Sequence, residues 1–193
     1  MEKNNTLTKS IAFSLPIASF IILIVTGIIL AKKNSEWWTQ FITTFYMPNA
    51  ALYYTLSLLF VILLPFVWIA AIQRCTIPQC VTTHVIFILI SLFLLLWLIY
   101  IYKVKNIRLA LSFLAIAWFF MIISTIMLWS IGQQVGASIM LLMVLWTTVV
   151  WLLVNNSHQV MLQTMFTNMR TVVDHKRLDP IDEEQGLDDL FRE

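Results

Sequence analysis

Long uncharged apolar runs alternate with short polar segments along the chain. The runs cover about residues 10–31, 50–72, 81–102, 109–131 and 137–154. Each run is close in length to the roughly 20 residues that an α-helix needs to cross the hydrocarbon core of a bilayer. None of them contains Asp, Glu, Lys or Arg. The pattern predicts an all-α integral membrane protein in which residues 10–156 form a bundle of five transmembrane helices.

The segments that flank these runs are polar or amphipathic. Residues 1–9 are predicted to form a polar leader, and the first run is longer than the 7–15 apolar residues of a signal peptide, so we predict a retained span. Residues 157–173 carry apolar side chains at mostly helical spacing, which predicts a juxtamembrane amphipathic helix. Residues 174–193 hold eight of the ten acidic residues and are predicted to form a flexible tail.

The basic residues divide unequally between the two sides that five spans define. The side of the N-terminus carries Lys3, Lys9 and Arg74. The opposite side carries Lys32, Lys33, Lys103, Lys105, Arg108, Arg170, Lys176 and Arg177. Because loops rich in Lys and Arg stay in the cytoplasm, the pattern predicts an N-terminus outside and a cytoplasmic C-terminus. We expect the chain in a bacterial inner (cytoplasmic) membrane.

The composition excludes several classes of function. Only 11% of the 193 residues are charged and 60% are hydrophobic, whereas soluble domains carry roughly a quarter charged residues. No basic patch suggests nucleic acid as a partner. Ion-coupled transport uses ionisable residues inside spans, and His84 is the only such residue in the runs. No acid–base pair, activated nucleophile or phosphate-binding loop is visible, so we predict that the protein is not an enzyme.

Two cysteines lie close together in the predicted second loop. Cys75 and Cys80 are five positions apart, on the side that we expect to be outside. An oxidising compartment favours a disulfide, but two free thiols at the end of a span are an equally open interpretation. His84 would be only a third candidate ligand at loose spacing, so we predict no metal site.

Two of the eight tryptophans lie deep inside predicted spans. Trp118 and Trp146 are each about ten residues into a run, where a buried indole N–H needs a hydrogen-bond partner that hydrocarbon does not offer. The rings could simply fill space between helices. Alternatively, they wall a pocket for a flat, largely apolar ligand. Trp118, Thr125 and Trp129 share one face of the fourth span and would form one wall.

The spacing of the tryptophans resembles the TspO/MBR family of tryptophan-rich sensory proteins. The matching motifs are Trp37-Trp38, Met47-Pro48-Asn49, Trp97, Leu109-Ala110-Leu111, Trp118, Trp129, Trp146 and Val154-Asn155. They extend over residues 36–156. The resemblance implies a five-span fold that binds a porphyrin or a sterol-like lipid between its helices, with no cofactor required. Candidate ligand-binding residues are Trp97, Trp118, Thr125, Trp129, Trp146 and Asn155.

Three departures from the family pattern fall at positions that shape its pocket. Leu94 replaces an Asn, Thr43-Thr44 replaces Lys-Pro in the first loop, and Leu142 replaces a Pro. The resemblance therefore implies a shared fold with different ligand chemistry.

A competing interpretation is a structural or assembly subunit of a larger membrane complex, or a homodimer. Leu187, Leu190 and Phe191 in the acidic tail are spaced at i, i+3 and i+4, so a short helix would place them on one face. Such a face could dock in the groove of a cytoplasmic partner. The ligand-binding interpretation predicts a cavity walled by tryptophans. The subunit interpretation predicts tight packing between the helices.

Overall fold

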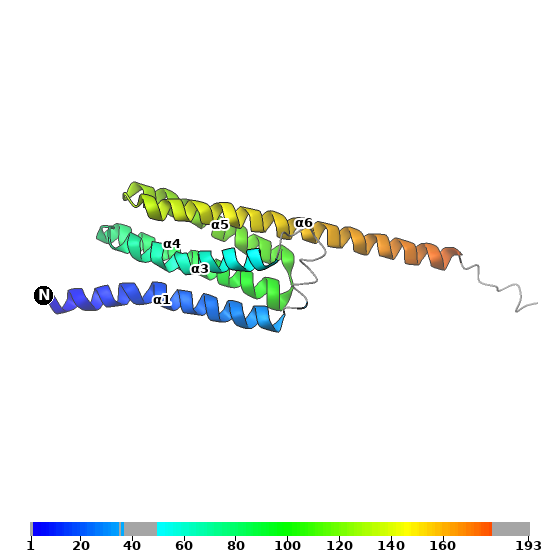
Figure 1. The fold of residues 1–193 in the computed structure, drawn as a ribbon, viewed down its shortest axis with the longest axis horizontal. Helices are drawn as coiled ribbons and strands as arrows, with labels where there is room; N and C mark the ends of the chain where they lie inside the picture. The colour runs from blue at the N-terminus through cyan, green and yellow to red at the C-terminus, as the bar shows by residue number, and fades with distance from the viewer. Residues whose placement is uncertain (1, 35, 37–49, 179–193) are drawn as a thin grey trace, which may run out of the picture. The chain divides into compact units, whose positions relative to one another are not determined.

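The structure is a computed structural model that describes residues 2–34, 36 and 50–178, and every described secondary-structure element is helical (Figure 1). The elements are α1 (Glu2–Lys33), α3 (Ala50–Ile72), α4 (Ile77–Leu98), the π-helix η1 (Ile99–Val104), α5 (Ile107–Ser130) and α6 (Gln134–Leu178). The described residues contain five stretches long and apolar enough to cross a membrane: Phe13–Lys33, Thr55–Ile72, Pro78–Val104, Ile107–Ser130 and Gln134–Thr167. This confirms the predicted all-α membrane fold with five spans.

Two helices are longer than the runs that predicted them. Helix α1 begins at Glu2, so most of the predicted polar leader is helical. Helix α6 continues through Asn155 and Asn156 to Leu178, so the chain stays helical across the boundary that we predict after residue 156. The physical reason is that no Gly or Pro, the residues that end helices, lies between Gly136 and Pro180. A second compact unit starts within α6, at His158.

The turn between the third and fourth spans is shorter than predicted. The helix of the third span continues as η1 to Val104, and the chain reverses at Lys105, whose φ of 59° lies in the left-handed region. The side chain of Asn106 then accepts a hydrogen bond from the backbone N–H of Leu109 at 3.2 Å, which caps α5.

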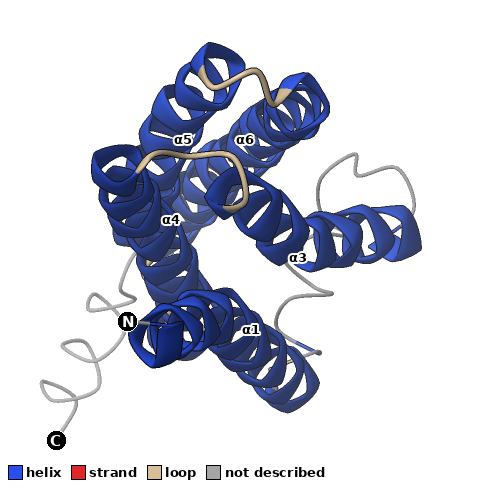
Figure 2. Cartoon of the chain, turned by 90° about the vertical axis from the view of Figure 1, so that its left-hand side faces the viewer, coloured by secondary structure: helices blue, strands red, loops and turns tan. Residues whose placement is uncertain are grey.

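The spans in residues 1–157 pack as two hairpins and one additional helix (Figure 2). Helix α4 packs against both α3 and α5, and α1 packs against α3 and α4. A hydrogen bond links the α3–α4 turn to the α5–α6 turn: Arg74 Nη1 donates to the carbonyl of Gly132 at 3.3 Å. Gln133 Nε2 also donates to the carbonyl of Ala70 at 2.8 Å. Both hairpin turns therefore lie at the same end of the bundle.

The helices bury aromatic and aliphatic side chains between them and leave apolar side chains on the outside. The buried cluster includes Leu64, Val67, Trp68, Phe87, Ile90, Met121, Leu128, Met140 and Met143. Large exposed apolar residues include Ile28, Phe66, Val81, Phe119, Ile126 and Leu145. An apolar exterior is what a helix bundle surrounded by lipid requires. The fold thus has a lipid-facing surface and a separate interior that can hold a site.

Candidate ligand-binding cavities between the helices

A small cavity lies at the centre of the bundle. It measures about 70 Å³ and is lined by residues of α3, α4, α5 and α6. Trp97 of α4 and Trp146 of α6 both line it, together with Phe60 of α3, whose ring centroid is 6.3 Å from that of Trp146. Trp146 Nε1 donates to Ser57 Oγ at 3.3 Å, so a hydroxyl of α3 is a partner of this indole. The cavity brings together two predicted site residues from different spans.

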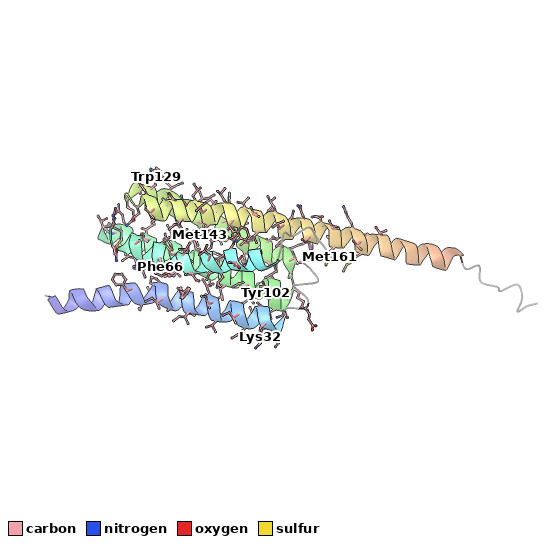
Figure 3. All side chains as sticks on the ribbon, in the orientation of Figure 1. Lys32, Phe66, Tyr102, Trp129, Met143 and Met161 are labelled. Atoms are coloured by element: carbon pink, nitrogen blue, oxygen red, sulfur yellow. A yellow bond between two sulfur atoms is a disulfide. The ribbon has the colours of Figure 1, made fainter. Side chains whose placement is uncertain are left out.

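A larger cavity of about 260 Å³ lies between α1, α3 and α4. It shares Ser57, Val61, Leu94 and Trp97 with the central cavity, so the two are neighbours across one wall. Gly27, which has no side chain, and Ala31, which has only a methyl group, also line it from α1 and leave room beside α4. Tyr102, which is buried, lines the cavity from η1. Figure 3 shows Tyr102 near the end of the bundle that carries Lys32.

The shared wall contains an indole whose polar atom is not satisfied. Trp97 is 9% exposed, and its Nε1 is buried without a hydrogen-bond partner among the described residues. A buried donor left without a partner costs about 1–3 kcal/mol. Trp118 and Trp146, in contrast, both have hydroxyl partners. Trp97 is therefore the tryptophan of the three with an unused donor.

A third cavity of about 250 Å³ lies between α5 and α6. Trp118 and Trp151 line it, with Ala115 and Thr148. Trp118 Nε1 donates to Thr148 Oγ1 at 2.9 Å, which joins the two helices. The neighbouring span thus supplies the hydrogen-bond acceptor that the indole of Trp118 needs in the middle of the membrane. Trp118 lines a different cavity from Trp97 and Trp146.

The remaining predicted site residues do not line any of these three cavities. The hydroxyl of Thr125 donates to the carbonyl of Met121 within its own helix at 2.8 Å. Trp129 is 64% exposed and lies near the α5–α6 end of the bundle (Figure 3), which suits an indole at the membrane interface. Asn155 is half-buried on α6. Of Trp118, Thr125 and Trp129, Trp118 alone lines one of these three cavities, so these cavities do not bring the three residues together.

Several predictions fall on residues outside the described part of the chain. These are the first-loop motifs Trp37-Trp38, Thr43-Thr44 and Met47-Pro48-Asn49, and the tail residues Leu187, Leu190 and Phe191.

A buried contact between α3 and α4 is not among the features predicted from the sequence. Trp68 is 1% exposed, and its Nε1 donates to Nδ1 of His84 at 3.2 Å. The ring of Trp68 also stacks on Phe87, with centroids 5.4 Å apart. Because Nδ1 accepts, the neutral imidazole carries its hydrogen on Nε2. His84 is therefore a structural partner of Trp68.

Cys75 and Cys80 form a disulfide across the α3–α4 turn. Sulfur atoms bonded to each other cannot act as thiolate ligands. Among the described residues, no three His, Cys, Asp or Glu side chains are grouped so that they could hold a metal ion.

These features define the class of protein as a five-span helical membrane protein with cavities between its helices. Comparisons with known protein families, with curated proteins and with solved structures find no match. The resemblance to the TspO/MBR family thus stays a prediction based on the tryptophan motifs.

Proposed function

We propose that the protein binds a flat, apolar ligand between its helices inside the membrane, and that it acts in sensing or passage of that ligand. The observation that carries the proposal is the cavity lined by both Trp97 and Trp146 at the centre of four helices. Aromatic rings favour flat apolar molecules by stacking. The motifs that resemble the TspO/MBR family support the same function.

The cavity volumes favour a ligand smaller than a tetrapyrrole. Pockets for drug-sized ligands measure about 300–1,000 Å³, whereas the two neighbouring cavities measure about 70 and 260 Å³. A single small ring system suits this space. A porphyrin would require α1 to move away from α3 and α4.

The orientation that we propose places the N-terminus outside and the C-terminus in the cytoplasm. The excess of Lys and Arg on one side supports it. The Cys75–Cys80 disulfide lies at the opposite end, which suits an oxidising exterior. Two independent features thus favour the same orientation in a bacterial inner membrane.

The proposal can be tested by filling the two cavities that Trp97 lines and, separately, the α5–α6 cavity. Val61 lines the central cavity and the cavity beside α1, so Val61→Phe should abolish binding of 2-methylnaphthalene to the purified protein in lipid nanodiscs. Ala115 lines only the α5–α6 cavity among the three, so Ala115→Phe is the matched control and should leave binding unchanged. Binding by both variants at the level of the natural sequence would refute the proposal.

A second candidate function, a subunit that docks a partner, is favoured by the helical part of the second unit. Within residues 158–178, Val160, Met165 and Phe166 are exposed, and Phe166 is 68% exposed. Such side chains suit a partner's apolar groove or the headgroup region. If this candidate is correct, Phe166→Asp should release co-purifying proteins without changing membrane insertion. An unchanged set of co-purifying proteins would contradict it.

A further inference from the structure

The indole of Trp97 lies between two unfilled volumes. Its ring lines both the central cavity of about 70 Å³ and the cavity of about 260 Å³ beside α1. Its Nε1 is shielded by neighbouring atoms and has no partner among the described residues. Space on two sides gives the ring room to turn. A hydrogen-bond acceptor of a ligand in the larger cavity could then bind Trp97 Nε1, which has no other partner among the described residues.

A second donor lies on the same wall. Ser57 also lines both cavities, and its Oγ accepts the hydrogen bond from Trp146. That bond uses a lone pair of the oxygen and leaves the hydrogen of the hydroxyl to donate. Trp97 Nε1 can only donate and the Ser57 hydroxyl can still donate, so the wall offers two donors to a ligand that carries acceptors.

The surroundings determine the charge and shape of such a ligand. The described residues that line the cavity include no Asp, Glu, Lys or Arg, so a charged group held beside Trp97 would lack a counter-ion in the lining, in a medium where isolated charges are costly. The rings of Trp97 and Tyr102 line the cavity and favour a flat molecule. The ligand class is thus neutral, flat and rich in acceptors.

The depth of Trp97 argues against an ordinary bilayer lipid as the source of the acceptor. Trp97 precedes Lys103 by six residues, which is at most roughly 9 Å along the axis, the length of six α-helical residues at 1.5 Å each, because η1 in this stretch is a wider and shorter π-helix. If Lys103 lies at the headgroups, Trp97 lies in the hydrocarbon region. The ester carbonyls of a phospholipid remain near the headgroups, whereas a small ring with carbonyl oxygens can enter more deeply.

We propose that the cavity between α1, α3 and α4 binds a neutral quinone-type ring, one carbonyl oxygen of which accepts a hydrogen bond from Trp97 Nε1. This inference rests on the proposed function and adds the chemical class of the ligand. The proposed step is binding only, without electron transfer: the quinone carbonyl accepts the hydrogen bond from Trp97 Nε1 and is not reduced. The probe is 2-methyl-1,4-naphthoquinone, and the matched ligand without carbonyls is 2-methylnaphthalene. Neither ligand meets a free thiol, because both cysteines of the chain are in the disulfide.

The test follows the indole N–H signals of the protein in nanodiscs by ¹H–¹⁵N NMR. The signal that is missing from the Trp97→Phe spectrum identifies Trp97. The quinone should shift this signal downfield, as hydrogen bonding does, and 2-methylnaphthalene should not. Trp97→Phe keeps a flat ring and should weaken quinone binding by about two- to tenfold, the range for one hydrogen bond. The same variant should weaken binding of 2-methylnaphthalene less than binding of the quinone, because Phe keeps an apolar ring and removes only the N–H donor.

The outcomes separate this inference from the function on which it rests. If both ligands bind equally and the Trp97 signal does not shift, the site is an apolar cavity without acceptor recognition and the inference fails alone. If neither ligand binds, both the inference and the proposed function fail. Trp129→Phe is the control variant, because Trp129 is 64% exposed and lines neither cavity. It should bind the quinone like the natural sequence.

Discussion

The contact between Trp68 and His84 should make a measurable contribution to stability. Trp68 is 1% exposed, so Trp68→Ala leaves a cavity and should cost about 3–5 kcal/mol, as for other large-to-small core substitutions. Trp68→Phe keeps a ring next to Phe87 but removes the hydrogen bond to His84 Nδ1. Hydrogen bonds between membrane helices contribute about 0.6 kcal/mol on average and up to about 1.7 kcal/mol.

A double-mutant cycle isolates the hydrogen bond itself. Trp68→Phe and His84→Phe each remove the bond while keeping an aromatic ring, and the double variant removes it only once. The coupling free energy should therefore be about 0.6–1.7 kcal/mol. The measurement is unfolding in mixed micelles of increasing SDS content, followed by circular dichroism. Additivity of the two changes to within about 0.3 kcal/mol would refute the argument. Trp129→Phe, at an exposed position, should change stability by less than about 0.5 kcal/mol.

Two other predictions concern the end of the bundle where the hairpin turns meet. A membrane-impermeant maleimide added outside sealed cells should label Cys75 and Cys80 only after a reductant is added, because the thiols are in a disulfide; labelling only from the cytoplasmic side would reverse the proposed orientation. A Cβ at Gly136 would lie 3.5 Å from Val67 Cγ1 and 3.6 Å from a methyl of Leu128, which is ordinary contact. Gly136→Ala should therefore be tolerated, and Gly136→Leu should cost about 1–3 kcal/mol by overpacking. Equal unfolding midpoints of the two Gly136 variants would contradict this.

The number and positions of the spans could be predicted from the sequence because each apolar run matches the thickness of a bilayer. The second run was predicted at residues 50–72, and α3 is Ala50–Ile72. The ends of α1 and α6 could not be predicted in the same way. Hydropathy measures where lipid contact ends, whereas a helix ends where a residue breaks its hydrogen bonds. No such residue lies near Asn155.

The candidate site was only partly predictable. Tryptophan spacing along one helix grouped Trp118 with Trp129, but a cavity is formed by residues of several helices, and Trp97 and Trp146 share one instead. The contact between Trp68 and His84 could have been predicted from the positions of the two residues in the sequence. The two residues lie eight positions on either side of Thr76, so an antiparallel hairpin that turns there places them opposite each other. The unpaired donor of Trp97 had no such signal, because it depends on the packing of α1 and α3 around it.

Binding of a flat apolar ligand between the helices is the central claim, and a saturation measurement tests it most directly. Radiolabelled 2-methyl-1,4-naphthoquinone is titrated into nanodiscs that contain the protein and into empty nanodiscs of the same lipid. The account predicts saturable binding that approaches one molecule per chain above the linear partitioning into lipid. It also predicts that this component is absent from Val61→Phe and present in Ala115→Phe, because Val61 lines the two cavities that share Trp97 and Ala115 lines neither of them. Linear uptake equal to that of empty nanodiscs would contradict it.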